Sequence, residues 1–143
     1  MPTDNEQLRK IIKEIQARHS GTDARAVAAS AIDIWSRLAF KFVPLLGPNS
    51  VNSIYARSLE FNKPAFPWLP ASLRQDVAEL PFAVLKESFE FRQVDEIIRA
   101  NHALIDTFIN LLATLIGARL VTPFLRSAFA HEAHQKDIQE NQA

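Results

Sequence analysis

The segments "LLGPNSVNSIYARSL" (residues 45–59) and "LIGARLVTPFLRSA" (residues 115–128) share a pattern that decides the expected fold. Each begins with two aliphatic residues and a glycine, places Val four positions after the glycine, and ends near an Arg-Ser pair. Upstream of them lie the related motifs "IDIW" (residues 32–35) and "IDTF" (residues 105–108). The pattern predicts two αα-hairpins, each with a long helix, a glycine turn and a shorter helix. Either an internal duplication with pseudo-two-fold symmetry or convergence between two apolar helices explains the likeness.

Apolar residues recur at helical spacing along most of the remaining chain. Thr3 and Glu6 have the spacing of a capping box, which predicts a helix start. The expected helices cover about residues 4–19, 23–46, 49–61, 72–80, a short stretch from Pro81, 93–116, and a last stretch after Gly117. The chain is therefore expected to be all-α, a single-domain bundle of about five to seven helices over residues 1–133. Residues 134–143 form a polar tail that we expect to fray.

Composition excludes several classes of function. Hydrophobic residues make up 48% of the 143 residues, as in globular domains, and the 16 Lys and Arg residues balance the 16 Asp and Glu residues. No net charge attracts nucleic acid, although a local basic patch is left open, and we expect no nucleic-acid partner. The absence of cysteine excludes disulfides, thiolate catalysis and Cys-ligated metals. No glycine-rich phosphate loop or other cofactor motif is present, so no cofactor is expected.

Neither end of the sequence nor its most apolar segment predicts a membrane protein. The first 19 residues are charged and amphipathic, without the apolar centre of a signal peptide. The charge-free run at residues 107–118 is too short to span a bilayer. We therefore expect a cytoplasmic location and no membrane span.

Two arginines are the candidate ligand-binding cations. Arg57 and Arg126 follow the two glycines, and Asp33 and Asp106 precede them in the long helices. A buried guanidinium must be paired, so one hypothesis is an Arg–Asp brace in each hairpin, and a second is simple exposure of these arginines to solvent. The alternative is a pocket that binds a carboxylate or phosphate, because guanidinium groups suit bidentate anion binding.

In that alternative, aromatic side chains from both hairpins would line the ligand pocket. The candidates are Trp35, Tyr55 and Phe108, together with Arg57 or Arg126.

Two apolar features are candidate partner-binding surfaces. The amphipathic N-terminal helix, within residues 1–20, carries one narrow apolar stripe made of Leu8, Ile11, Ile12 and Ile15. The proline-rich segment at residues 62–72 carries Phe66 and Trp68, which can either plug the core or hook a partner.

The four histidines do not predict a metal or catalytic site. His131 and His134 are three residues apart, whereas the zincin motif needs a spacing of four. His19 ends a helix, where a cation would favourably oppose the helix dipole. His102 lies beside Asn101, and we expect it to be hydrogen-bonded or exposed.

The leading expectation is a non-enzymatic interaction or regulatory module, adaptor-like in signalling, in the bacterial cytoplasm. It would bind a protein partner or self-associate as a homodimer. The alternative is a small-molecule sensor that holds an apolar or anionic ligand between the hairpins. An interaction module predicts an exposed apolar strip on the first helix or the Trp68 loop, whereas a sensor predicts a pocket that touches at least one arginine.

Overall fold

The computed structural model describes residues 3–71 and 82–129. Within these ranges 81% of the residues are helical and no strand occurs, which confirms the predicted all-α class. The short helix predicted at residues 72–80, the polar tail at residues 134–143, and the pair His131 and His134 lie outside the described residues.

The described helices follow the predicted order closely. They are α1 (Asp4–Gln16), α2 (Ala24–Leu46), α3 (Pro48–Asn62), α4 (Phe82–Glu90), α5 (Val94–Ile116) and a further helix at residues 118–129. The largest difference lies at the end of α1, predicted near residue 19 and observed at Gln16. The predicted capping box is confirmed, because the Thr3 hydroxyl accepts from the Glu6 amide and the Glu6 carboxylate accepts from the Thr3 amide.

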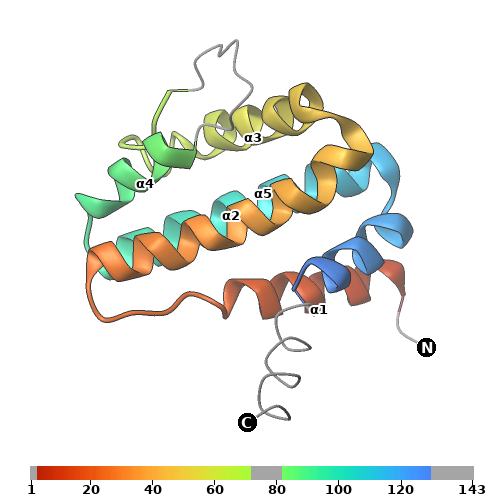
Figure 1. Ribbon diagram of the computed structural model, residues 1–143, viewed down its shortest axis with the longest axis horizontal. Coiled ribbons are helices and arrows are strands. Elements are labelled where there is room, and N and C mark those ends of the chain that lie inside the picture. Colours follow the sequence, from red (N-terminus) through yellow and green to blue (C-terminus); the bar gives the residue numbers. More distant parts are fainter. Residues whose placement is uncertain (1–2, 72–81, 130–143) are drawn as a thin grey trace, which may run out of the picture.

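The helices form three layers (Figure 1). The long helices α2 and α5 cross the middle, α3 and α4 lie on one side of them, and α1 and the 118–129 helix lie on the other. α2 packs against α3, α4 and α5, while α5 also packs against α1 and α3. The core therefore runs along both long helices, and the outer layers cover it on two sides.

The two hairpins match each other at a constant offset of 70 residues. α2 and α5 each contain 23 residues, and their starts (24 and 94), ends (46 and 116) and following glycines (47 and 117) all differ by 70. Gly47 and Gly117 have φ angles of 87° and 91°, a backbone region that favours glycine. The first buried residue after each glycine, Val51 or Val121, also follows this offset. The predicted pair of long-short hairpins is therefore present.

The offset changes the relation between the two Arg-Ser pairs noted in the sequence. A shift of 70 residues places Arg57 opposite Ser127, and Arg126 opposite Ala56. The two arginines are thus not equivalent positions of a repeat, although the helices that carry them are.

Each hairpin is preceded by a helix with the same burial spacing, so the matched unit contains three helices. α1 buries Leu8, Ile11 and Ile15, and α4 buries Phe82, Leu85 and Phe89 at the same intervals. α1 packs against α5, and α4 packs against α2, so each first helix contacts the long helix of the other unit.

The third helix of each unit, α3 or the 118–129 helix, also contacts the long helix of the other unit. α3 packs against α5. The 118–129 helix contacts α2, where Lys41 Nζ donates to Ser127 Oγ over 2.6 Å and the Phe42 and Phe124 rings are 6.0 Å apart. Each long helix is therefore covered by helices of both units.

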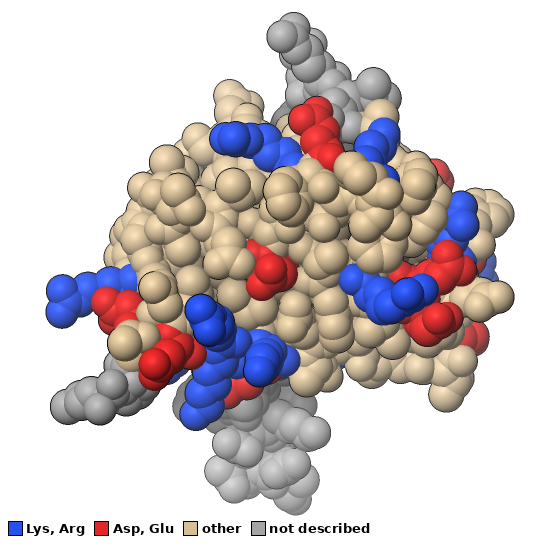
Figure 2. All heavy atoms as spheres, turned by 180° about the vertical axis from the view of Figure 1, so that it is seen from behind, with Lys and Arg blue, Asp and Glu red and all other residues tan. Residues whose placement is uncertain are grey.

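The surface carries its charges unevenly. Figure 2 shows a broad area of uncharged residues on one face, with Lys, Arg, Asp and Glu side chains gathered mainly toward its edges. No helix in the described ranges is long and apolar enough to cross a membrane.

Candidate functional site

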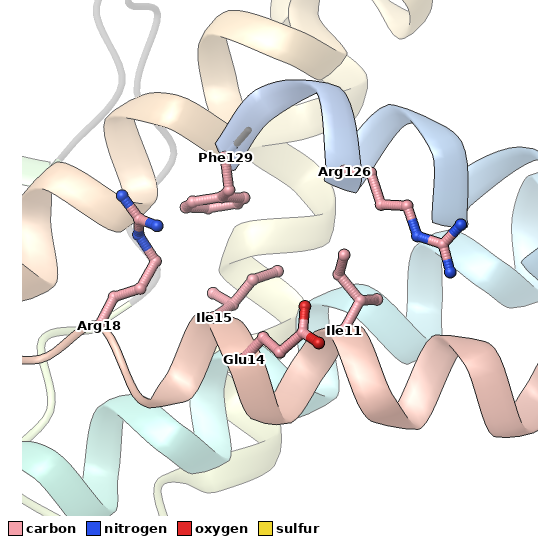
Figure 3. A pocket seen from close by; sticks show the side chains of 6 residues that line it. All are labelled: Ile11, Glu14, Ile15, Arg18, Arg126 and Phe129. Carbon is pink, nitrogen blue, oxygen red and sulfur yellow. The ribbon is translucent and has the colours of Figure 1, made fainter. Parts of the chain in front are cut away.

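A groove lies between α1 and the 118–129 helix (Figure 3). Its volume is about 310 Å³, at the lower end of the range for small-molecule sites. The residues that line it are Ile11, Glu14, Ile15 and Arg18 from the α1 side, and Arg126 and Phe129 from the 118–129 helix.

The floor of the groove is apolar because it is made from the stripe of α1. Ile11, Ile15 and Phe129 are buried and belong to the hydrophobic core. Ile11 is 6% exposed, Ile15 1% and Phe129 7%, so the floor presents a small area that is apolar.

The same packing buries the apolar stripe of α1 that was predicted to be a partner-binding surface. Leu8, Ile11, Ile12 and Ile15 are all buried within the chain's own core. The N-terminal helix therefore uses its apolar face inside this fold and does not present an exposed strip.

The rim of the groove is charged, with one more cation than anion. The Arg18 guanidinium lies 5.1 Å from the centre of the Phe129 ring, a cation–π arrangement across the two walls. Arg126 is exposed and extends from the 118–129 helix away from Phe129, and the Glu14 side chain lies between the two arginines in Figure 3. The groove thus combines an apolar floor with an accessible guanidinium.

Arg57 and Arg126 do not form a common site. Arg57 is exposed on α3, in the layer on the far side of the long helices from the 118–129 helix. The predicted Arg–Asp braces are wrong, because Asp33 pairs with Arg37 one turn away, with 2.9 Å between Oδ2 and Nε. Asp106 is exposed and accepts a hydrogen bond from Asn110.

The three aromatic candidates, Trp35, Tyr55 and Phe108, form the packed centre of the molecule. Each is 1% exposed, and the Trp35 ring meets Tyr55 at 5.2 Å and Phe108 at 5.1 Å in edge-to-face contacts. None of them lines the groove, because all three rings are covered by one another and by α4. The helical spacing of these residues in the sequence correctly predicted that their side chains face inward. It could not distinguish the wall of a pocket from a filled core.

The proline-rich segment also packs on its own chain. Phe66 and Trp68 are partly buried, with 6.1 Å between their rings, and the Trp68 ring lies 5.9 Å from Phe89 of α4. The Arg92 guanidinium covers the Trp68 ring at 4.9 Å. Both side chains therefore contribute to the packing of their own chain while remaining partly exposed.

A second hollow of about 470 Å³ lies beyond Arg18, between the α1–α2 connection and α2. Its lining includes Ser20, Ser30 and Asp33. The Ser30 hydroxyl already bonds to backbone groups, and Asp33 is paired with Arg37. This hollow therefore offers fewer uncommitted groups to a ligand than the groove does.

Behind the Arg18 end of the groove lies a polar cluster that sequence reasoning missed. Trp35 Nε1 donates to Asn101 Oδ1 over 2.7 Å, and the Asn101 amide nitrogen lies 2.7 Å from His19 Nε2. His19 Nδ1 lies 2.8 Å from the carbonyl oxygen of Gln16, which is also 3.0 Å from His102 Nε2. The neighbouring polar residues Asn101 and His102 were a weak signal for such a cluster in the sequence. The residues that bond to Asn101 are more than 60 positions away in the chain.

His19 does not have the surroundings of a cation. Burial lowers the pKa of its imidazole, the hydrogen bond to Gln16 opposes that change, and the nearby His102 adds to it. The expectation of a charged His19 at the helix end is therefore wrong.

Within the described ranges, no group of three or more His, Cys, Asp or Glu side chains could hold a metal ion. Comparisons with protein-family models, curated proteins and solved structures gave no match to this chain.

Proposed function

We propose that this protein is a non-enzymatic sensor that binds a small amphiphilic anion in the groove between α1 and the 118–129 helix. The ligand would have an anionic head and a short apolar chain. The observation that carries the proposal is that the exposed Arg126 and the apolar residues Ile11, Ile15 and Phe129 line the same groove, with the Arg126 guanidinium at one end of it (Figure 3). A regulatory role in the cytoplasm is part of the proposal.

The chemistry of the lining sets the class of ligand. A guanidinium binds a planar or tetrahedral anion through paired N–H donors, and the apolar floor gains from covering a hydrocarbon chain. The volume of about 310 Å³ limits the chain to a short one. Glu14 at the rim disfavours ligands with a second negative charge near the chain.

Octanesulfonate is a suitable probe because its head stays anionic over the whole useful pH range. Titration by calorimetry or NMR is expected to show one site, with shifts at residues of α1 and of the 118–129 helix. Arg126→Gln is expected to weaken binding about tenfold or more, since hydrogen bonds to charged groups contribute about 1.5–3 kcal/mol. Octanol, which lacks the charge, is expected to bind more weakly than octanesulfonate and to be insensitive to this change.

Arg57→Gln is the matched control, because Arg57 is also an exposed arginine and lies outside the groove. It removes the same charge and should leave the affinity unchanged. Equal losses in the two variants, or equal binding of octanol and octanesulfonate, would contradict the proposal.

A second candidate function, self-association, is favoured by exposed leucines at one end of the bundle. Leu45 is 43% exposed, Leu115 60% and Leu120 42%. All three lie close to Gly47 or Gly117, and both glycine turns lie at the same end of the long axis (Figure 1). Exposed apolar residues gathered in this way are typical of protein contacts.

Sedimentation equilibrium of the wild type and of Leu115→Lys tests this second candidate. A dimer that the substitution dissociates would support contact through this end. The control is Phe91→Lys, because Phe91 is 89% exposed and lies between α4 and α5, far along the chain from both turns. A wild-type monomer, or equal dissociation in both variants, would contradict it.

A further inference from the structure

The hydrogen-bond directions in the polar cluster are fixed by Trp35. An indole N–H can donate but cannot accept, so the Asn101 atom that faces it at 2.7 Å must be the oxygen. The amide nitrogen of Asn101 consequently faces His19 Nε2, also at 2.7 Å. This orientation follows from chemistry alone and does not depend on how the amide was assigned.

The orientation of Asn101 in turn fixes the tautomer of His19. An amide –NH₂ group only donates, so His19 Nε2 must accept and therefore carries no proton. The single ring proton then sits on Nδ1 and is donated to the Gln16 carbonyl oxygen, 2.8 Å away. Every polar atom in this chain of three side chains is satisfied only while His19 is neutral.

A proton on His19 Nε2 would place two donors against each other. Turning the Asn101 amide would present an acceptor to His19, but would then set its –NH₂ group against the Trp35 N–H. No arrangement of these groups satisfies all the donors once His19 is charged. Burial of the ring acts in the same direction, because it lowers the pKa of His19.

Among the described residues, the neighbouring charges do not offer an alternative partner for a charged His19. From α5, the titratable group that faces it is His102, whose ring centre is 5.0 Å away and whose charge would repel it. From α2, the cluster receives the uncharged Trp35. Arg18, the preceding residue, is itself a cation and lies over Phe129 of the 118–129 helix.

The cluster holds the end of α1 in place. His19 and Asn101 join the α1–α2 connection to α5, and Gln16 and His102 exchange two further bonds of 3.0 Å. α1 also forms the wall of the groove that carries Ile11 and Ile15, and Arg18 follows shortly after its end.

We propose that His19 is an acid-sensitive latch, which holds the C-terminal end of α1 on α5 when neutral and releases it when protonated. Because the pKa of His19 is lowered in the folded state, the latch is closed above the ordinary histidine value of about 6.5 and opens as the pH falls through the folded value. The effect on groove affinity rests on the proposed function, but the latch itself does not.

Two measurements on the unliganded protein test the latch. Long-range ¹H–¹⁵N NMR of the histidines is expected to show the Nδ1–H tautomer of His19 and a pKa below that of a free histidine. Amide hydrogen exchange, corrected for intrinsic rates, is expected to show protection of the end of α1 falling between about pH 7.5 and 5. Each unit by which the pKa is lowered corresponds to about a tenfold loss of protection. An Nε2–H tautomer, or constant protection of α1, would overturn the proposal.

Asn101→Asp is expected to preserve the protection of α1 at acid pH, in contrast to its loss in the wild type. A carboxylate at this position can accept from the Trp35 N–H and from a protonated His19 together, so protection of α1 is expected to persist at about pH 5.5. His102→Gln separates the two histidines: it also removes the contact between His102 Nε2 and the Gln16 carbonyl oxygen, but because His19 and Asn101 are kept, a loss of protection at acid pH should persist. Identical loss in the wild type and Asn101→Asp would overturn the latch even if the NMR tautomer is as expected.

The link to the groove is tested separately with octanesulfonate, whose own charge does not change over this range. Its affinity is expected to fall at acid pH in the wild type but not in Asn101→Asp. If octanesulfonate does not bind at any pH, the proposed function fails, while the exchange and NMR results still decide on the latch.

Discussion

At the scale of single residues, the buried polar side chains differ in how well they are satisfied. Trp35 and Asn101 are both within the core, and each finds its partner at 2.7 Å. Tyr55 is equally buried, but its hydroxyl has no hydrogen-bond partner among residues 3–71 and 82–129. A buried donor without a partner lowers stability, because it loses its bonds to water and gains none in return.

Tyr55→Phe is therefore expected to raise the free energy of unfolding by about 1 kcal/mol. The ring contacts with Trp35 and Phe82 would be retained, since only the hydroxyl is removed. Urea denaturation followed by circular dichroism measures the difference.

The contrasting variant is Trp35→Phe, which removes a donor that is in use and leaves the Asn101 oxygen unpaired. It is expected to lower the free energy of unfolding by at least about 1–3 kcal/mol. If Tyr55→Phe lowers stability as well, the hydroxyl must have a partner in solution, such as an ordered water molecule.

For the individual site residues, the sequence predicted which way side chains face but not what they contact. Periodicity correctly indicated that Trp35, Tyr55 and Phe108 face inward, because helical spacing reports only the side of a helix. It could not report how closely facing rings pack, which decides between a core and a pocket. Arg126 was singled out for its charge and does line a groove, but the walls of that groove come from segments more than 100 residues apart.

At the scale of elements, the two glycine turns set the lengths of the long helices. Gly47 and Gly117 combine φ angles of 87° and 91° with extended ψ angles of 154° and 141°. Residues other than glycine rarely adopt this conformation. A Cβ atom added at either position would meet nothing within 4 Å, so any cost is conformational rather than steric.

Gly47→Ala and Gly117→Ala are consequently expected to lower the free energy of unfolding by similar amounts, about 1–3 kcal/mol each. Thermal or urea denaturation of the two variants provides the comparison. Gly21→Ala should cost more, because its Cβ would lie 2.6 Å from the Ala26 Cβ atom and add a clash to a φ angle of 117°. A neutral result at one turn and a large loss at the other would show that the two turns are not equivalent.

The helices themselves were largely predictable, and the reasons are local. Thr3, Gly47 and Gly117 mark helix limits through hydrogen bonds and dihedral angles that involve only nearby residues. The end of α1 was not predictable, because Gln16 stops the helix while His19 turns toward α5 to reach Asn101. That contact joins residues 82 positions apart, and no local pattern records it.

At the scale of the whole molecule, the likeness between residues 45–59 and 115–128 reflects the architecture. The sequence comparison suggested paired arginines and paired Ile-Asp motifs, yet the 70-residue offset aligns neither. What the two units share is the length of the long helix, the geometry of the glycine turn and the spacing of buried residues. Physical constraints on packing preserve those properties even where side chains differ.

The crossed packing of the two units carries a consequence for the origin of the chain. Each long helix depends on helices of the other unit for its cover: α2 on α4 and the 118–129 helix, and α5 on α1 and α3. A dimer of two half-length chains would give this crossed packing if each long helix packed against helices of the partner and the two chains were later fused end to end. A fragment of residues 1–71 is then expected to be dimeric in its folded state. In that dimer α1 and α3 of each copy would pack against α2 of the other copy. Light scattering combined with circular dichroism distinguishes this dimer from a folded monomer, which would contradict the expectation.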